Sequence, residues 1–361
     1  MKQFAFVIHP LDLNGVSVAY REPGLTNIKP SLLHKAFEWM KPYPCAEVTG
    51  VVSRTGVKIS GHLLYLSLLP EQIIRMDQKT VFNKLVDTCR LAEDLGADIL
   101  GLGAYAAQIG KKGVEVSRKT RIPVTTGTNY TIYVAVWGLE KACEMSGCKL
   151  DGRTIAVVGA TGKIGSVCAR MLASKAGRMI LSARSRSRLE PLKTELEQTH
   201  GITVEIEADA RKAIIGAEVS VISTTTPEPL VDLKDLPSGA IVCDVSRPAN
   251  VSNHGNLLRD DVLVMDGGVV RPPGKELNLN FYIGLPQGVT YACMAETMLL
   301  AMEERYESYS IGGDVSLQKV RETGAWGHKH GFELAEIMSF GRTIPAERVR
   351  RLSKSFREKP K

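Results

Sequence analysis

The stretch Thr154–Ser166 constrains the fold more than any other part of the chain. Ile155–Val158 is a short apolar run, as expected of a strand buried on both faces of a parallel sheet. Three glycines spaced three apart follow it, and Ser166–Ala173 continues with helical periodicity. A strand, a glycine turn and a helix in this order are the context that a dinucleotide fingerprint requires. The stretch therefore predicts a bound nucleotide cofactor, with its phosphates at the helix N-terminus.

The residues around the glycine turn are the first candidate binding residues. In such a turn the first glycine permits the tight bend, the second lets the backbone approach a pyrophosphate, and the third lets the helix pack closely on the strand. A bare structural turn is the alternative. The residues expected to contact the cofactor are Gly159, Thr161, Gly162, Lys163 and Ile164.

Strands and helices alternate along the chain beyond this turn. Such alternation is typical of an α/β protein whose parallel sheet is covered by helices on both faces. It predicts a doubly wound parallel sheet of the NAD(P)-binding Rossmann type. The further strands of this sheet are expected at Met179–Ser182, Val204–Ile206, Val219–Pro227, Ala240–Pro248 and Asp261–Gly268.

The residues after the second strand, Met179–Ser182, indicate which nicotinamide cofactor binds. Sites that prefer NAD place an Asp or Glu there to bind the ribose 2′-hydroxyl. This chain has Arg184, Ser185 and Arg186 instead, and a guanidinium suits a 2′-phosphate. A solvated helix start is the alternative explanation of the arginines. The segment favours NADPH.

Loops after the last three strands are expected to line the cleft where a nicotinamide would lie, because ligands bind at the carboxyl ends of parallel strands. Turn chemistry alone would also explain each of these small residues. The residues nominated for the cofactor are Thr224, Thr225, Gly267 and Gly268, with Ser246 beside them and Ser223 as a substrate or oxyanion candidate.

The first 125 residues predict an α/β substrate domain with an N-terminal strand at Lys2–Ile8. The turn Arg54–Gly56 suggests a hairpin. Thr80–Leu95 carries apolar residues at helical spacing, and Gly96 after it is a natural C-cap. The other elements are expected to be strands at Glu47–Ser53, Val57–Ser60, His62–Leu69 and Ala97–Gly103, with a short helix near Leu32–Met40.

Small polar residues open the next helix, which is expected to run from the stretch Val124–Thr131 to about Met145. Residues of this kind suit N-caps and anion-facing loops equally well. Thr126, Thr128 and Asn129 are therefore candidates for binding the substrate or an oxyanion, and helix capping is the alternative.

A second, strongly apolar helix is expected at Gly288–Met302, with Cys293 near its first turn. The dipole and the unpaired N–H groups of a helix N-terminus stabilise a thiolate over a thiol, so this position suits a nucleophile. A free cysteine also packs well in a core, and the Met and Leu neighbours favour that alternative. Position alone leaves both readings of Cys293 open.

The carboxyl-terminal part of the chain is expected to be helical over Val315–Gly331. His328 and His330 in this stretch are expected to be surface or packing residues. Much of the formal charge of +7 lies in the tail Arg348–Lys361. This tail is more typical of a solvated helix end than of a docking surface, and an acidic partner is the alternative.

The composition is that of an ordinary globular protein, with 44% hydrophobic and 24% charged residues in 361. No apolar run is long enough to span a bilayer, no signal-peptide pattern opens the chain, and seven scattered cysteines indicate reduced thiols, so we expect a cytoplasmic location. No metal site and no nucleic-acid partner are expected, and the oligomeric state is open. We expect a substrate domain at 1–125, an NADP-binding domain at 126–290, and C-terminal helices with the candidate nucleophile and the basic tail at 291–361.

Several segments together resemble one enzyme family, in its order and spacing, from about residue 90 to residue 332. The resemblance is to the long-chain acyl-(acyl-carrier-protein) reductases, which form aldehydes. The matching segments are Thr125–Tyr133, Val158–Ser166, Asp266–Val270, Tyr291–Leu300 and His328–Phe332. Tyr291–Leu300 is the most specific of them. Tyr130 stands where the family has a histidine, and the first ninety residues differ most.

The resemblance implies that Cys293 is the nucleophile and that NADPH is the reductant. It implies reduction of a long-chain acyl thioester, carried by acyl carrier protein or coenzyme A, to a fatty aldehyde through an acyl-enzyme on this cysteine. An aldehyde-consuming enzyme would then be a partner. Two other classes stay open: an NADP-dependent dehydrogenase of a small hydroxy or amino acid, similar to shikimate dehydrogenase, and a non-catalytic nucleotide-binding protein.

Overall fold

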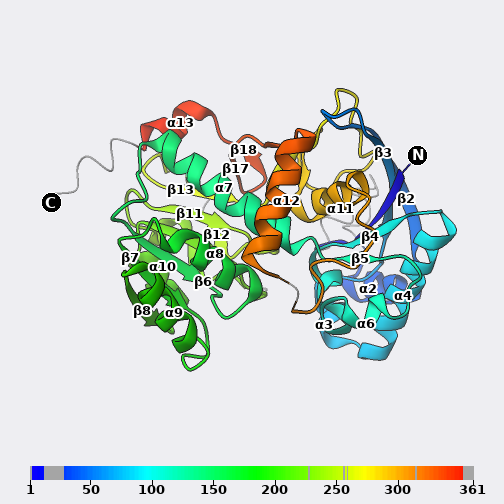
Figure 1. Cartoon of the computed structure of the whole chain (residues 1–361). Coiled ribbons are helices and arrows are strands. Elements are labelled where there is room, and N and C mark those ends of the chain that lie inside the picture. The colour runs from blue at the N-terminus through cyan, green and yellow to red at the C-terminus, as the bar shows by residue number, and fades with distance from the viewer. Residues whose placement is uncertain are drawn as a thin grey trace. The chain divides into compact units, whose positions relative to one another are not determined.

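Six parallel strands form one sheet in the middle of the chain in the computed structural model (Figure 1). They lie in the order β13-β11-β9-β6-β7-β8, so the first strand, β6, lies between the second, β7, and the fourth, β9. This is the strand order of the doubly wound dinucleotide-binding fold, whose ligand site lies where the order reverses, between β6 and β9. The strands are β6 (Thr154–Val158), β7 (Arg178–Ser182), β8 (Thr203–Glu207), β9 (Val219–Ile222), β11 (Ile241–Asp244) and β13 (Leu263–Asp266).

The structure describes residues 2–11, 28–226, 228–254, 257, 259–313 and 315–352. The chain divides into unit 1, Met1–Thr131 with Val270–Glu333, and unit 2, Ile132–Val269 with Leu334–Lys361. Both units have parallel strands and helices, which confirms the predicted α/β class. The expected division of roles at residues 125 and 290 stays a prediction. Pro227 and the part of the basic tail beyond Leu352 lie outside the described residues.

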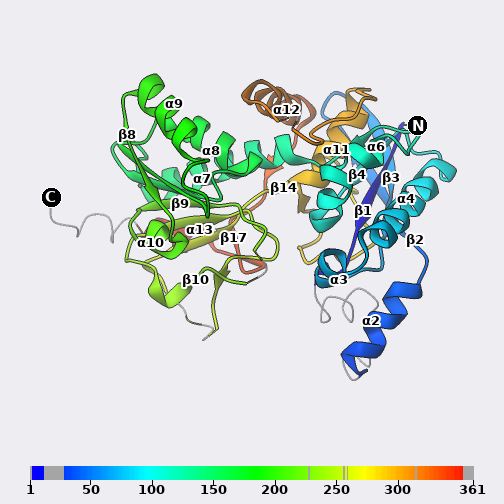
Figure 2. The ribbon, with the colours of Figure 1, turned by 90° about the horizontal axis from the view of Figure 1, so that it is seen from below.

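Helices cover both faces of the unit 2 sheet. Figure 2 shows α8 and α9 on one face and α10 on the other. Ala213 and Ile214 of α10 pack with the alternate strand residues Ala156 and Val158, because successive side chains of a strand point to opposite faces. The helices of this part are α7 (Thr128–Ser146), whose first turn belongs to unit 1, α8 (Lys163–Ala173), α9 (Glu190–His200) and α10 (Ala210–Ile215).

Unit 1 is built on a second sheet, in the order β2-β3-β1-β4-β5. Strand β1 is parallel to both of its neighbours, whereas the edge strand β2 is antiparallel to β3. The strands are β1 (Lys2–Ile8), β2 (Tyr43–Val52), β3 (Lys58–Tyr65), β4 (Ile99–Leu102) and β5 (Val124–Thr125). The helices of its first segment are α2 (Pro30–Trp39), α3 (Pro70–Arg75), α4 (Gln78–Asp94), α5 (Ile109–Lys112) and α6 (Val114–Ser117).

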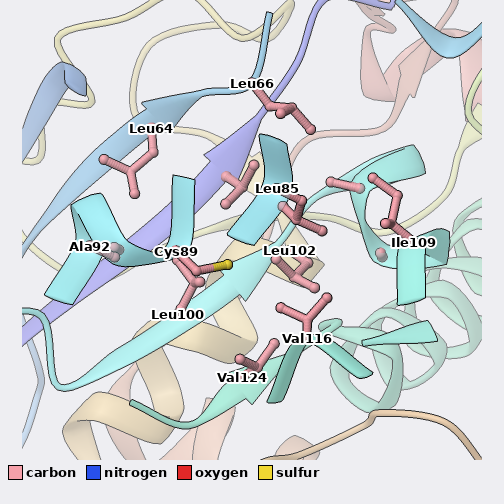
Figure 3. Packing of buried hydrophobic residues seen from close by; sticks show 14 of the residues in the cluster. Leu64, Leu66, Leu85, Cys89, Ala92, Leu100, Leu102, Ile109, Val116 and Val124 are labelled. Carbon is pink, nitrogen blue, oxygen red and sulfur yellow. The ribbon is translucent and has the colours of Figure 1, made fainter. Parts of the chain in front are cut away.

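The core of unit 1 lies between its sheet and α4. Leu85, Cys89 and Ala92, at helical spacing on α4, pack on Leu64 and Leu100 of the strands (Figure 3). All five side chains are fully buried. This core confirms the amphipathic helix expected at Thr80–Leu95.

The other face of the unit 1 sheet packs against α11 (Ala292–Met302). A Cβ at Gly101 of β4 would lie 2.1 Å from the Thr297 Oγ1 atom of this helix and 2.4 Å from the Phe6 ring. Only glycine therefore lets α11 approach the centre of the sheet. Two described helices remain. Helix α12 (Leu317–His330) lies in the second segment of unit 1, and α13 (Ala346–Arg351) lies in the second segment of unit 2.

One expected pair of strands is a single strand. Val57–Ser60 and His62–Leu69 were expected to be separate, but β3 runs unbroken from Lys58 to Tyr65. Gly61 does not interrupt it, because the Phe4 ring fills the space beside it, 2.6 Å from where a Cβ would stand.

Several short elements have no strong sequence pattern and were not expected. They are the strands β10 (Val231–Asp232), β12 (Val251–Ser252), β14 (Val269–Arg271), β15 (Thr290–Tyr291), β16 (Glu333–Leu334), β17 (Met338–Ser339) and β18 (Arg342–Thr343), and the 3-10 turns Ala104–Gln108 and Leu233–Asp235. Among the described helices, none has both the length and the apolar character needed to cross a bilayer.

Candidate active site

Cys293 is the second residue of α11 in unit 1 and differs from the rest of that helix in its exposure to solvent. Ten of the eleven residues of α11 are buried, whereas Cys293 is partly exposed. The N-cap residue, Tyr291, is extended and makes no side-chain capping hydrogen bond. The apolar sequence thus fixes the helix in the core, and its first turn presents a thiol beside the backbone N–H groups of the helix N-terminus.

The other cysteines differ from Cys293 in their surroundings. Burial raises the pKa of Cys45 and of Cys168 to about 12, and it also raises the pKa of Cys89 and of Cys243. Those thiols are held in the protonated, unreactive form. A hydrogen bond with Cys148, together with burial, likewise raises the pKa of Cys143. All seven cysteines are free of disulfides.

The backbone of Gly127 lies directly against Cys293. A Cβ at Gly127 would stand 2.2 Å from the Cα atom of Cys293 and 2.4 Å from its Cβ atom, and the φ angle of Gly127 is +70°. Both facts require glycine here. The turn that opens α7 therefore meets the start of α11, and the predicted residues Thr126, Thr128 and Asn129 lie in the turn that contacts the predicted nucleophile.

Glu296, one turn after Cys293, ties the two segments together. This buried carboxylate accepts hydrogen bonds from the Thr125 hydroxyl at 2.6 Å, the Ser310 hydroxyl at 2.6 Å and the Tyr130 N–H at 2.7 Å. Burial raises the pKa of Glu296, and these donors act in the opposite direction. The first turn of α7 is thus capped by a carboxylate from α11.

The hydroxyls of the predicted oxyanion residues are already engaged. Thr126 donates its proton to the Ser310 carbonyl oxygen at 2.7 Å, so in its 2.8 Å contact with Thr128 the Thr128 hydroxyl must donate. Asn129 is fully buried and donates its amide to the Ser310 hydroxyl at 2.8 Å. The Thr128 N–H, in contrast, makes no hydrogen bond with any described residue. A backbone donor rather than a hydroxyl is therefore available beside Cys293.

The glycine turn of unit 2 has the form that a dinucleotide requires. Gly159 has φ +83°, and a Cβ there would lie 2.3 Å from the Ser223 carbonyl oxygen. A Cβ at Gly165 would lie 2.5 Å from the Gly159 carbonyl oxygen, so close packing of α8 on β6 requires the third glycine. Ser223 thus belongs to the glycine turn of unit 2.

Gly162 is different, because the chain itself does not need a glycine there. A Cβ at Gly162 would meet one atom, the Gly159 carbonyl oxygen at 3.1 Å, and this residue caps α8 without a side-chain hydrogen bond. The neighbours Thr161, Lys163 and Ile164 are partly exposed around it. A helix N-terminus that begins at a glycine fits a pyrophosphate.

Arg184 and Arg186 lie directly after β7, both exposed. Arg184 makes no ion pair with a described residue, and Arg186 makes a long one of 3.4 Å with Glu190. The Ser185 hydroxyl lies 3.3 Å from the Ser187 hydroxyl. Both guanidinium groups can therefore bind a phosphate at little cost, because an exposed ion pair contributes little.

A buried network shapes the loops after β9 and β11. Asp244 accepts from the N–H groups of Ser246 and Asn250 at 3.0 and 2.6 Å, and the Thr224 hydroxyl donates to the Asn250 side chain at 2.5 Å. The Thr224 N–H donates to Ser246 at 3.0 Å. The hydroxyl of the predicted residue Thr224 thus stabilises the loop, whereas Thr225 is exposed.

Of the two predicted glycines after β13, Gly267 is required by packing, since a Cβ would lie 2.8 Å from the Cys243 sulfur. Gly268 has φ +74° and lines a half-open cavity of about 570 Å³ within unit 2. Trp137 and Met145 of α7 and Met265 of β13 contribute apolar walls to it. Its size is that of a small-molecule site.

Comparison with known proteins bears on what these residues do. The chain is 30% identical over 301 residues to a long-chain acyl-(acyl-carrier-protein) reductase of Synechococcus elongatus, a match that covers 80% of this chain and 86% of that protein. The chain belongs to the long-chain acyl-(acyl-carrier-protein) reductase family. It is also 26% identical over 366 residues to the aminotransferase PigE of a Serratia species, covering 98% of this chain but only 42% of that longer protein.

Other similarities concern the nucleotide-binding part. The shikimate / quinate 5-dehydrogenase family profile matches residues 140–266, which hold the parallel sheet of unit 2. Among solved structures, L-tryptophan dehydrogenase of Nostoc punctiforme is 14% identical, with 72% of this chain and 65% of that chain covered and a TM-score of 0.34. The family and the dehydrogenase profile make the chain an NAD(P)-dependent oxidoreductase.

The family assignment leaves two polar clusters that the sequence did not predict. His330, expected to be a surface or packing residue, is 1% exposed and bridges Ser53 at 2.7 Å and Glu303 at 2.6 Å, whereas His328 is exposed. Glu296 lies in Tyr291–Leu300, the family's most specific segment, but it is not among the site residues predicted from the sequence. An acidic residue inside an otherwise apolar helix was a usable signal, because a buried carboxylate needs donors.

Proposed function

We propose that this family member reduces a long-chain acyl thioester to an aldehyde, with NADPH as reductant and Cys293 as the covalent nucleophile. The observation that carries the proposal is the setting of Cys293. It is the partly exposed residue of an otherwise buried helix and lies in the first turn of that helix, with the backbone of Gly127 directly against it. A thiolate needs access and positive potential, and this position supplies both.

The Cys293 sulfur bonds to the thioester carbonyl carbon, the bond from that carbon to the carrier sulfur breaks, and the carrier leaves as a thiol with a proton taken from Cys293 or solvent. NADPH, when bound, supplies a hydride. The acyl carbon accepts it and becomes a hemithioacetal oxyanion on Cys293. Collapse of this anion breaks the carbon–sulfur bond and releases aldehyde and thiolate, so one proton is consumed overall.

The oxyanion needs fixed donors at Cys293. We assign this role to the Thr128 N–H together with the first N–H groups of α11, because the hydroxyls of Thr126 and Thr128 are engaged elsewhere. Glu296 acts as a positioning residue: it holds the first turn of α7 against α11 through the Tyr130 N–H. Asn129, fully buried, supports the same turn through Ser310.

The residues of unit 2 fit NADPH. Gly162 and the start of α8, with Thr161, Lys163 and Ile164, would hold the pyrophosphate, and Arg184, Ser185 and Arg186 would hold the 2′-phosphate. Thr224, Thr225, Gly267 and Gly268 would border the nicotinamide. The acyl donor is acyl carrier protein or coenzyme A, and a second enzyme would consume the aldehyde.

The experiment is intact-mass analysis after incubation with hexadecanoyl-coenzyme A, without NADPH. We expect a single acyl adduct that disappears when NADPH is added, with aldehyde appearing. Cys293→Ser changes the volume little and should lose both the adduct and the aldehyde, because a hydroxyl is far harder to ionise than a thiol at neutral pH. Cys45→Ser is the matched control and should keep both. Turnover by Cys293→Ser near the unmodified rate would exclude the covalent route.

The second candidate is a dehydrogenase of a small hydroxy or amino acid, which the match of residues 140–266 to the shikimate / quinate 5-dehydrogenase profile favours. That chemistry needs no thiol. The same experiment separates the candidates, since such a dehydrogenase, or a protein that only binds the nucleotide, gains no acyl adduct.

A further inference from the structure

Helix α2 of unit 1 has two apolar faces, and only one is covered. Leu33 and Phe37, four residues apart, are buried against the body of the unit. Leu32, Ala36 and Trp39 follow the i, i+4, i+7 spacing of a second stripe on the helix, and all three are exposed. Trp39 is 83% exposed and Leu32 57%, and Ile28 just before the helix is 39% exposed. These side chains follow one another along the helix, and a contiguous exposed apolar patch indicates an interaction surface.

The inner contacts of α2 hold its outer face in a fixed position. The Lys84 ammonium donates to the carbonyl oxygens of Phe37 and Glu38 at the end of the helix. The Gln72 amide donates to the His34 carbonyl oxygen at 2.9 Å, and His34 itself pairs with Glu71 at 2.9 Å. Figure 2 shows α2 at the margin of unit 1, away from its sheet. The exposed face is thus presented by an anchored helix.

The charges around this face favour an anionic partner. Lys29 and Lys41 flank the helix, and Lys35 lies on the outer face itself; all three are exposed. Glu38 is the acidic residue of the helix. Exposed Leu and Trp side chains bordered by lysines are the pattern of helices that lie in the interface of a bilayer, where the apolar side chains enter the acyl region and the lysines meet anionic headgroups.

We propose that α2 docks unit 1 onto the surface of an anionic lipid bilayer. A bilayer accepts Leu32 and Trp39 without a complementary pocket, whereas an acidic protein would need a groove shaped to a helix of ten residues. Docking through α2 is separate from the proposed function and rests on it only for the identity of the product. A long-chain aldehyde partitions into a bilayer, so docking would release the product where it dissolves.

The test uses the full chain and lipid vesicles, with no activity readout. We expect it to sediment with vesicles of phosphatidylcholine and phosphatidylserine at low salt, and less with phosphatidylcholine alone. Trp39 fluorescence should shift to the blue, and Trp39→Phe should bind but lose that shift. Leu32→Ser/Trp39→Ser should weaken binding at least about tenfold, whereas Lys29→Gln/Lys35→Gln/Lys41→Gln should remove most of the salt dependence. Tyr282→Ser, which removes another aromatic residue of unit 1 that is 56% exposed, is the matched control.

Circular dichroism of every variant checks that it is folded, as exposed positions should allow. Three results would overturn the proposal: no sedimentation with anionic vesicles, equal weakening by Tyr282→Ser, or capture of an acidic acyl carrier protein by α2 without vesicle binding. Loss of the Cys293 adduct would leave the vesicle result unchanged, so the docking surface and the proposed chemistry can fail separately.

Discussion

At the scale of single residues, the starts of α7 and α11 meet at Cys293. Cys293 and the turn at Thr126–Asn129 could be nominated because each opens a helix. That Gly127 lies against Cys293, and that Glu296 holds the turn, depends on contacts between residues more than 160 positions apart. No local pattern encodes such contacts. Of the threonine hydroxyls nominated for an oxyanion, that of Thr128 donates to Thr126 and that of Thr126 donates to the Ser310 carbonyl oxygen.

Gly162→Val tests the glycine turn. The side chain would meet little of the protein but would occupy the place of a pyrophosphate, so NADPH binding should be lost while the free energy of unfolding changes little. Calorimetric titration with NADPH and urea unfolding measure the two quantities. Gly165→Ala is the contrast, because its Cβ would collide with the Gly159 carbonyl oxygen and should lower stability. Retained NADPH binding by Gly162→Val would make the turn merely structural.

Arg184→Ala/Arg186→Ala tests the choice of cofactor. We expect the unmodified chain to bind NADPH at least about tenfold more tightly than NADH, which corresponds to about 1.4 kcal/mol from a charge-assisted phosphate contact. The double variant should lose most of that preference while its NADH affinity stays the same. Arg188→Ala, an exposed arginine of the same segment, is the control. Equal affinities for the two cofactors in the unmodified chain would contradict the assignment.

At the scale of elements, apolar periodicity placed most of the longer helices and most strands of the two sheets to within a few residues, but it gave no bounds for α9 or β5. It failed where packing overrides propensity. Gly61 read as a break between strands, yet β3 continues through it because the Phe4 ring needs the space. Strands of two residues, such as β10 and β12, pair without any pattern long enough to detect. Even so, Val231 and Val251 of these two strands pack in the core of unit 2.

Gly127→Ala tests the junction between the starts of α7 and α11. The new methyl group would overlap Cys293, and the φ angle of +70° is unfavourable for alanine. We expect the acyl adduct to be lost and the unfolding free energy to fall by about 1–3 kcal/mol. Gly56→Ala is the control, since Gly56 also has positive φ, +84°, but nothing lies within 4 Å of its Cβ position. It should keep the adduct. Loss of the adduct in both variants would point to backbone strain alone.

At the scale of the whole molecule, the chain order does not match the spatial grouping. Val270–Glu333 joins the first 131 residues in unit 1, so the helix with Cys293 packs on a sheet whose first strand is Lys2–Ile8. The sequence can suggest where a nucleotide-binding sheet begins and ends. It cannot show that the following segment returns to the start of the chain, because this depends on tertiary contacts alone.

The stability of the whole chain should depend on pH through His9. This buried ring accepts the Tyr105 N–H at 3.0 Å and lies 2.9 Å from the Pro10 carbonyl oxygen, so it is neutral in the fold. Burial lowers the pKa of His9 from 6.5 to about 4. Below the ordinary pKa of 6.5 the unfolded chain binds a proton that the folded chain does not bind. The contribution of His9 to the free energy of unfolding is therefore complete above that pKa and is lost as the pH falls towards the folded pKa of about 4.

Between about pH 7 and about pH 5, His9 should account for a loss of about 2 kcal/mol in the free energy of unfolding. Urea unfolding at the two pH values measures this loss. His9→Gln should start less stable, because its hydrogen bonds are impaired, but its stability should change with pH by that much less. If both proteins change equally between the two conditions, His9 is not the titrating group.

The partly exposed cysteine on a buried helix also determines how the protein would lose activity during storage. Oxidants attack accessible thiolates first, and most other cysteines of this chain are buried with raised pKa values. On the proposed chemistry, damage would therefore concentrate on Cys293 and would leave the surrounding core packed. A stored preparation would keep its fold and its cofactor binding while its working fraction fell, one oxidised sulfur per molecule. The accessibility that the proposed chemistry needs at Cys293 also makes this thiol the one most open to oxidation.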